Sequence, residues 1–259
     1  MSGTTPVPPV PLLPEWHRIS HPVIGMLHAP PLPGSPKYRE PFSSVVARLL
    51  HDAEALTEGG VDGLMLENYG DAPFAAHRVE SVTVAALTRL ACEVRQRCPL
   101  PLGINVLRND ALAALAIAAV TGARYLRVNV LSGARLTDQG VITGEGYDLL
   151  RLRRQLQADD VRILADVDVK HSAPLARRPL ADETEELIQR GGADAVIVSG
   201  PGTGKPVSLT DLPEVTAAAA GRPVLVGSGA SLETLNRLLP FCNGFIVGSS
   251  LKVGGRPDG

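Results

Sequence analysis

The stretch that decides the fold is residues 223–250, PVLVGSGASLETLNRLLPFCNGFIVGSS. It holds two short apolar runs, 223–229 and 244–250, and each run ends in glycine and serine. Short apolar runs rich in β-branched residues are typical of buried parallel strands, and a stretch with helical character at 231–239 separates these two. The segment therefore predicts a strand–helix–strand unit with a glycine-rich loop after each strand.

The same alternation extends back to residue 23. Six more apolar runs predict strands at 23–27, 63–68, 102–107, 125–130, 162–168 and 195–200. The stretches between strands predict helices at 41–59, 80–97, 110–121, 146–157, 180–190 and 208–220. Eight strands alternating with helices imply a parallel sheet that is buried on both faces and closes on itself. The sequence thus predicts an α/β fold, a (β/α)8 TIM barrel over residues 21–259. The main alternative, an open doubly wound sheet, is disfavoured because no GxGxxG follows the first strand.

The two ends of the chain depart from the regular pattern. Residues 1–20 are rich in proline, which removes backbone donors and fixes φ, so we expect an extended arm with Trp16 held against the barrel. Only nine residues follow the last predicted strand, so the eighth helix is expected to be short or missing. The arm or a partner subunit would then cover that part of the barrel, which makes a homodimer an expectation.

Composition excludes several classes of protein. A net charge of -2 and a pI near 6.3 give no footprint for nucleic acid. No apolar run is long enough for a transmembrane segment, and no signal peptide is recognisable, so we expect a cytoplasmic protein. The three cysteines form no CxxC pair, which argues against a disulfide framework or a zinc site. No HExxH or similar spacing predicts a metal site, and no motif identifies a cofactor.

The loops after the last two strands are the strongest local signal. Barrels commonly hold phosphate there, because glycine lets the backbone approach an anion and helix N-termini complement its charge. We therefore predict phosphate binding by Gly227, Ser228, Gly229, Gly248 and Ser249. The alternative is that these glycines only permit tight turns. Residues 200–205, GPGTGK, do not have P-loop spacing and are better interpreted as a loop over the pocket, with Lys205 able to reach an anion.

Polar residues gather at the carboxyl ends of the other strands, where the active sites of barrels lie. The predicted catalytic residues are His28, Glu67, Asp166 and Lys170. The predicted substrate-binding residues are Asn105, Arg127, Asn129, Ser199 and Lys205.

Period-two alternation would place Asp166, Asp168 and Lys170 on one face, with Lys170 as the ion-pair partner of either aspartate. Structural alternatives stay open at three positions. The Asp–Lys pair would close the barrel mouth, Glu67 would cap a loop or pair with Arg127, and His28 would bond to backbone.

Six blocks of sequence together resemble the BtpA/SgcQ family, over about residues 21–253. They are HPVIGMLHAPPLPGSP (21–36), GLMLENYGDAPF (63–74), LGINVLRND (102–110), RVNV (127–130), TDQG (137–140) and ADVDVKH (165–171). The resemblance implies a barrel of the ribulose-phosphate-binding type. It also implies relatives of two kinds, since some photosynthetic members are linked to photosystem I biogenesis and the SgcQ branch lies among sugar-uptake genes.

The leading hypothesis is an enzyme that binds a phosphorylated small molecule, either a sugar phosphate or a nucleotide-like metabolite. Aldol-type cleavage, isomerisation and glycosidic transfer all fit the predicted residues, so a lyase, an isomerase and a glycosyl-transferring enzyme stay open. A Schiff base on Lys170 would need a lowered pKa, which adjacent aspartates would oppose. The alternative from a different class is a non-catalytic assembly factor that acts through protein partners.

Overall fold

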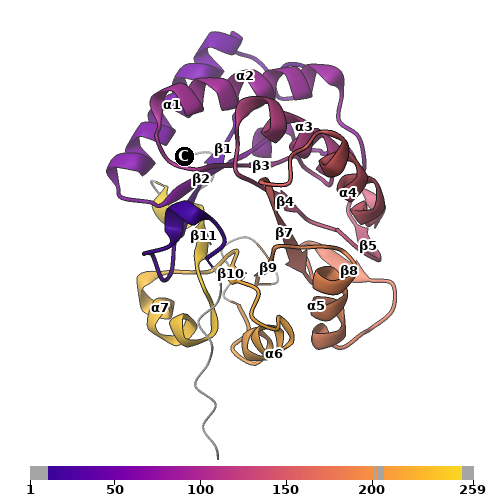
Figure 1. The fold of residues 1–259 in the computed structure, drawn as a ribbon. Coiled ribbons are helices and arrows are strands. Elements are labelled where there is room, and N and C mark those ends of the chain that lie inside the picture. Colours follow the sequence, from indigo (N-terminus) through magenta and orange to yellow (C-terminus); the bar gives the residue numbers. More distant parts are fainter. Residues whose placement is uncertain (1–10, 201, 203–206, 253–259) are drawn as a thin grey trace, which may run out of the picture.

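The computed structural model describes residues 11–200, 202 and 207–252. Eight parallel strands close into a barrel in the order β1-β11-β10-β9-β7-β4-β3-β2, which confirms the predicted TIM barrel. The helices form a ring around the strands (Figure 1). Of the helices in the described part of the chain, none is both long and apolar enough to cross a membrane.

The elements follow the predicted alternation closely. The barrel strands are β1 (Val23–His28), β2 (Gly63–Glu67), β3 (Leu102–Asn105), β4 (Tyr125–Val128), β7 (Arg162–Val167), β9 (Ala195–Val198), β10 (Val224–Val226) and β11 (Phe245–Val247). The helices are α1 (Phe42–Glu58), α2 (Ser81–Arg97), α3 (Ala111–Thr121), α4 (Gly146–Gln155), α5 (Leu180–Gln189), α6 (Asp211–Ala218) and α7 (Leu232–Leu238). Most strands end one to three residues earlier than predicted, because the polar residues after them turn into loops.

Capping residues explain where individual helices begin and end. Asp110 precedes α3 and its side chain accepts a hydrogen bond from the Ala113 backbone N–H at 2.9 Å. Gly122 ends the same helix in the left-handed conformation, with φ of 72°. Ser231 and Thr234 form a capping box at the start of α7.

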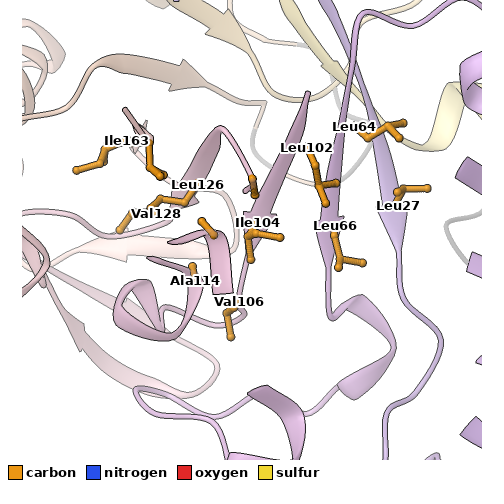
Figure 2. Close-up of a cluster of buried hydrophobic side chains, with 14 of the residues drawn as sticks. Leu27, Leu64, Leu66, Leu102, Ile104, Val106, Ala114, Leu126, Val128 and Ile163 are labelled. Atoms are coloured by element: carbon orange, nitrogen blue, oxygen red, sulfur yellow. The ribbon is translucent and has the colours of Figure 1, made fainter. Parts of the chain in front are cut away.

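The main core lies between the strands and the helices. Its residues are the outward-facing members of each strand, such as Leu64 and Leu66 of β2 or Leu126 and Val128 of β4, which are almost fully buried (Figure 2). Alternate residues of the same strands point into the barrel. Each strand is therefore apolar on its outer side and free to carry function on its inner side.

The lower half of the barrel interior is closed by the N-terminal segment. A turn of 3-10 helix, Pro14–Trp16, places the Trp16 ring in a second apolar cluster with Met65 and Tyr125. Trp16 is 2% exposed and its indole N–H donates to the Asp62 carbonyl at 2.9 Å, so the expected contact of Trp16 with the barrel is confirmed.

Tyr125 fills the centre of this floor. Its hydroxyl donates to the Leu64 carbonyl at 2.6 Å. A Cβ at Gly103 would lie 2.0 Å from the Tyr125 ring, so glycine is required there. Below the polar strand ends, the barrel interior is thus solid and apolar.

A small antiparallel sheet, which the sequence analysis did not predict, is inserted after the fourth and fifth barrel strands. β5 (Ala134–Thr137) and β6 (Gly140–Thr143) form a hairpin, and β8 (Ser172–Pro174) pairs with β5 on its other side. Because both insertions follow the carboxyl ends of barrel strands, this sheet stands beside the face where active sites of barrels lie.

The position of the eighth helix is covered from within the chain. After β11 only a short 3-10 turn, Ser249–Leu251, is described, and the Lys252 ammonium pairs with Asp52 of α1. The outer side of β11 is not open, since Phe245 is buried and its ring lies beside the His21 ring, with centroids 6.4 Å apart. The expected homodimer rested on an uncovered outer face of the barrel, and at Phe245 that face is covered.

Candidate functional site

A cavity of about 1080 Å³ opens at the carboxyl ends of the barrel strands. Its lining includes residues from β1, β2 and β4 and the loops after β3, β7, β10 and β11. The charged lining residues are Lys37, Arg48, Glu67, Arg108, Arg127, Asp138 and Lys170. Five basic side chains therefore line the cavity with two carboxylates. Arg48 and Arg127 also pair with Glu40 and Asp166, which do not line it, and the small excess of basic groups that remains favours an anionic ligand.

A polar row crosses the first three strands. The parallel register places His28 beside Glu67 and Glu67 beside Asn105. The Asn105 amide donates to Glu67 Oε2 at 2.5 Å, and Glu67 Oε1 lies 3.9 Å from His28 Nε2. Glu67 therefore neither caps a loop nor pairs with Arg127.

The His28 ring is held in the wall of the cavity. It packs against the Tyr69 ring, with centroids 4.7 Å apart. Burial lowers the pKa of His28 and outweighs the opposite effect of Glu67, so the imidazole is neutral at pH 7. A neutral imidazole next to a carboxylate is equipped to accept a proton.

The buried ion pair of the site joins β4 and β7. Arg127 Nε and Nη2 donate to the two oxygens of Asp166 at 2.9 and 2.7 Å, and Asn129 donates to Asp166 at 2.8 Å. The Asp166 side chain is 0% exposed and does not line the cavity, whereas Arg127 and Asn129 do. Asp166 thus holds two cavity residues in place from behind.

The expected ion pair between Lys170 and an aspartate is wrong. Asp166 is taken by Arg127, and Asp168 lies outside with its side chain 55% exposed, paired with Arg135 at 2.5 Å. The physical reason is that β7 ends at Val167 and Asp168 takes a left-handed conformation with φ of 47°. This turn breaks the period-two alternation that would have placed Asp166, Asp168 and Lys170 on one face.

Lys170 lies in the cavity with a fixed backbone. Arg108 Nη2 donates to the Lys170 carbonyl at 2.6 Å. Within the described part of the chain, no carboxylate lies within ion-pair distance of the Lys170 ammonium. Burial, and then the charge of Arg127, lower the pKa of Lys170.

The glycine-rich loops border the same cavity from β10 and β11. Gly227, Ser228, Gly229, Gly248 and Ser249 all line it, together with the start of α7. A Cβ on Gly227 would lie 2.7 Å from Ser199 Oγ and 3.6 Å from Arg127 Nη2. The loop after β10 therefore lies directly over Ser199 and reaches the Arg127 guanidinium.

Three polar atoms of the predicted residues are buried without a hydrogen-bond partner among the residues described. They are His28 Nδ1, Asn129 Oδ1 and Ser199 Oγ. Buried polar atoms are nearly always paired, and an unpaired one costs about 1–3 kcal/mol. His28 and Asn129 line the cavity, so these two residues are candidates for contact with a ligand, whereas Ser199 lies behind the lining.

The structure thus brings together nearly all of the predicted site. His28, Glu67, Arg127, Asn129, Lys170 and the five loop residues line the cavity, and Asn105, Asp166 and Ser199 lie behind them. Lys205 lies outside the described residues. Sequence reasoning missed four charged residues of the lining, which are Lys37, Arg48, Arg108 and Asp138. Arg108 follows a strand end in the LRND block and was therefore detectable, whereas Asp138 comes from the unpredicted hairpin.

Comparison with known proteins gives a consistent set of relatives. The model of the BtpA family matches residues 19–258. The chain is 48% identical over 238 residues to the photosystem I biogenesis protein BtpA of Synechocystis, covering 92% of this chain and 83% of the relative. It is 44% identical to the uncharacterised protein TK2179 of Thermococcus kodakarensis, covering 92% and 89% of the two chains.

Solved structures show the same fold at low sequence identity. N-(5'-phosphoribosyl)anthranilate isomerase of Pyrococcus furiosus is 15% identical with a TM-score of 0.56, over 92% of this chain and 94% of that one. Orotidine 5'-monophosphate decarboxylase of Methanocaldococcus jannaschii is 16% identical with a TM-score of 0.51, over 88% and 89%. These likenesses show the TIM-barrel fold.

Proposed function

The chain belongs to the BtpA family, and from that premise we propose that it is an enzyme acting on a phosphorylated small molecule, a sugar phosphate or a nucleotide-like metabolite. The observation that carries the proposal is the cavity at the carboxyl ends of the strands, where five cationic side chains and two glycine-rich loops surround one space. Two enzymes of this fold, reported above, have names that specify phosphate-bearing compounds.

The phosphate is assigned to the β10 and β11 side of the cavity. Ser228, Gly229, Gly248 and Ser249 offer backbone N–H groups and hydroxyls there, and Arg127 lines the same cavity. Gly227, whose N–H donates to the Val198 carbonyl at 2.8 Å, contributes by keeping the loop free of a side chain. Backbone donors beside a guanidinium suit the three oxygens of a phosphate group.

The opposite side of the cavity supplies the groups for chemistry. Glu67 and neutral His28 are placed to move a proton, with Asn105 orienting the carboxylate. Asn129 lines the cavity and Ser199 lies beneath the loop after β10, and both stay predicted substrate-binding residues. Asp166 acts as a positioning residue that fixes Arg127 and Asn129, and Lys170 stands beside the reacting part of the substrate.

The remaining expectations stay predictions. We place the protein in the cytoplasm, with Lys205 reaching the ligand from the loop over the cavity. Sedimentation at micromolar concentration tests the predicted homodimer, and finding only a monomer would refute that prediction.

A thermal-shift series tests the proposed function. Inorganic phosphate, dihydroxyacetone phosphate, ribulose 5-phosphate and nucleotides are added singly. A ligand at about 100 times its dissociation constant stabilises the folded chain by about 2.7 kcal/mol, which is a readily measured shift.

The matched pair of variants is Ser249→Asp and Ser43→Asp. Both add one negative charge, but Ser249 lines the cavity, whereas exposed Ser43, in the first turn of α1, does not. Stabilisation that is lost in Ser249→Asp and kept in Ser43→Asp supports the phosphate site. If no phosphorylated compound stabilises the protein, the proposal fails and an assembly factor acting through protein partners becomes the function to test.

A further inference from the structure

Lys170 lines the cavity with its amine buried and with no ion-pair partner among the residues that the structure describes. We infer that its side-chain amine forms an imine with the carbonyl carbon of a phosphorylated ketone or aldehyde. This inference rests on the proposed function and narrows its substrate class to compounds that carry both a phosphate and a carbonyl group.

The backbone around Lys170 holds it in one place. Two non-glycine residues near it, Asp168 and His171, have left-handed φ values of 47° and 59°. Non-glycine residues in this conformation persist where the surrounding structure fixes them. Arg108 adds a hydrogen bond to the Lys170 carbonyl at 2.6 Å. The side chain therefore leaves a rigid turn directly at the cavity wall.

Burial is the largest influence on the amine and favours its neutral form, and the charges around it act in both directions. Arg127 and Arg108 act against the ammonium, while Glu67 and Asp166 act in its favour from a greater distance than an ion pair, and His28 is also within range of its charge. Because Asp166 is held by Arg127 and Asp168 points outward, neither neutralises Lys170 directly. Burial works in the same direction as the two arginines and lowers the pKa of Lys170.

Composition gives an independent indication. Of the 25 lysine and arginine residues in the chain, only four are lysines, at 37, 170, 205 and 252. The chain otherwise uses arginine for positive charge, and a guanidinium does not lose its proton in a protein. An amine that becomes a nucleophile has to be lysine, which explains lysine at position 170.

The step balances without any further reactant. The nitrogen lone pair of neutral Lys170 attacks the carbonyl carbon, and the C=O π pair moves to oxygen, which takes up a proton. The carbinolamine nitrogen then loses its proton, the hydroxyl group leaves as water after protonation, and the C=N bond forms. Glu67 and His28 are the neighbouring groups that carry these protons, and a phosphate held at the glycine-rich loops keeps the carbonyl end of the substrate on the Lys170 side.

Borohydride trapping tests the inference on the full chain. The protein is incubated with dihydroxyacetone phosphate or ribulose 5-phosphate, reduced with sodium borohydride and analysed by intact mass and peptide mapping. Unphosphorylated dihydroxyacetone is the ligand control. Lys170→Arg and Lys170→Met are the test variants, Lys37→Arg removes the other described lysine that lines the cavity, and circular dichroism confirms that each variant is folded.

The expected result is one secondary-amine adduct on the peptide that contains Lys170. The adduct falls by at least about tenfold in both Lys170 variants, because an arginine cannot supply the neutral amine. The yield of the adduct is unchanged in Lys37→Arg, and it is low when dihydroxyacetone replaces the phosphorylated ketose. An adduct that persists in the Lys170 variants, or that lies on another lysine, overturns the assignment.

Thermal shifts on the same samples separate this inference from the function beneath it. Stabilisation by a ketose phosphate without any adduct overturns the imine and leaves the proposed function standing. Stabilisation by inorganic phosphate but by neither ketose phosphate overturns the substrate class inferred here. If no phosphorylated compound stabilises the protein, the proposed function itself fails, and the imine fails with it.

Discussion

Asp166→Asn is the substitution with the most sharply defined outcome, because the carboxylate has no exposed surface and three donors point at it. If Asp166 acted only as an acid or base, the amide would abolish turnover and leave stability unchanged. The geometry of the Arg127 pair gives a different expectation, which is a large loss of stability.

The magnitude follows from the individual hydrogen bonds. Asp166 Oδ2 accepts from Arg127 Nε and from Asn129, and Oδ1 accepts from Arg127 Nη2. An asparagine oxygen in the Oδ2 position keeps two of these bonds, but its NH₂ group then faces the Nη2–H donor. One charged hydrogen bond worth about 1.5–3 kcal/mol is lost, and a buried guanidinium is left without its counter-ion. Breaking such a pair costs about 3–5 kcal/mol in total.

Urea unfolding at pH 7 measures the cost, read from the midpoint at constant m-value. Asp168→Asn is the matched control, because Asp168 is 55% exposed and its partner Arg135 keeps two hydrogen bonds to Glu183. We expect it to cost less than about 1 kcal/mol. The double variant Arg127→Met/Asp166→Leu should recover much of the loss, since replacing both members of a buried pair by apolar residues is often neutral or stabilising.

A cost below about 1 kcal/mol for Asp166→Asn would refute this reasoning, because it would mean that Arg127 does not depend on the carboxylate. A double variant that is no more stable than Asp166→Asn would also refute this reasoning. Desolvation would then not be what makes the unpaired guanidinium costly.

Three further outcomes follow from the same structure. Trp16→Ala should lower the free energy of unfolding, measured in urea, by about 3–5 kcal/mol, because it empties the barrel floor. Trp16→Phe loses mainly the hydrogen bond to the Asp62 carbonyl and should cost about 1 kcal/mol. Equal costs for the two variants would contradict this expectation. Lys170→Met should stabilise the protein by about 1 kcal/mol at pH 7, as substitutions at functional sites often do. Because the pKa of Lys170 is lowered from 10.5, the unfolded chain binds more protons below that pH, so the gain should shrink as pH rises toward 10.5. Burial likewise lowers the pKa of His28 below 6.5, so the midpoint of an NMR titration of this imidazole should lie below pH 6.5. The free energy of unfolding should decrease as the pH falls below 6.5, because the unfolded chain then binds a proton at His28 more readily than the folded chain.

Most of the fold was predictable because hydrophobic periodicity records burial directly. The outward-facing residues of the strands, such as Leu64 and Leu66, are apolar because helices cover them, and the sequence shows this without any structure. The hairpin of β5 and β6 escaped the prediction because its residues alternate weakly and pack against few neighbours. Leu136 and Val141, opposite each other in this hairpin, are both exposed, so its pattern carries little information about burial.

The candidate site was predictable in membership but not in pairing. Parallel strands bring their carboxyl ends together, so His28, Glu67 and Asn105 had to lie close to one another once the barrel was assumed. Which side chain bonds to which depends on register and on local φ values, and neither is visible in composition or spacing. The wrong partner for Lys170 came from continuing the period-two alternation past the end of β7 at Val167 as far as Lys170.

That turn after Val167 decides the chemistry available at Lys170. If the strand continued, Asp168 would point inward beside the amine, and an opposite charge at 4 Å contributes about 4 kcal/mol in favour of the charged form near a protein surface. A permanently protonated lysine would bind an anion but would not attack a carbonyl. Because Asp168 points outward to Arg135 and Asp166 is held by Arg127, neither aspartate forms an ion pair with the amine, which is buried instead. The left-handed conformation of Asp168 thus prevents an ion pair with Lys170 and leaves the amine free to act as a nucleophile. A substitution that returns a carboxylate to that side of Lys170 should remove the borohydride adduct while phosphate binding remains.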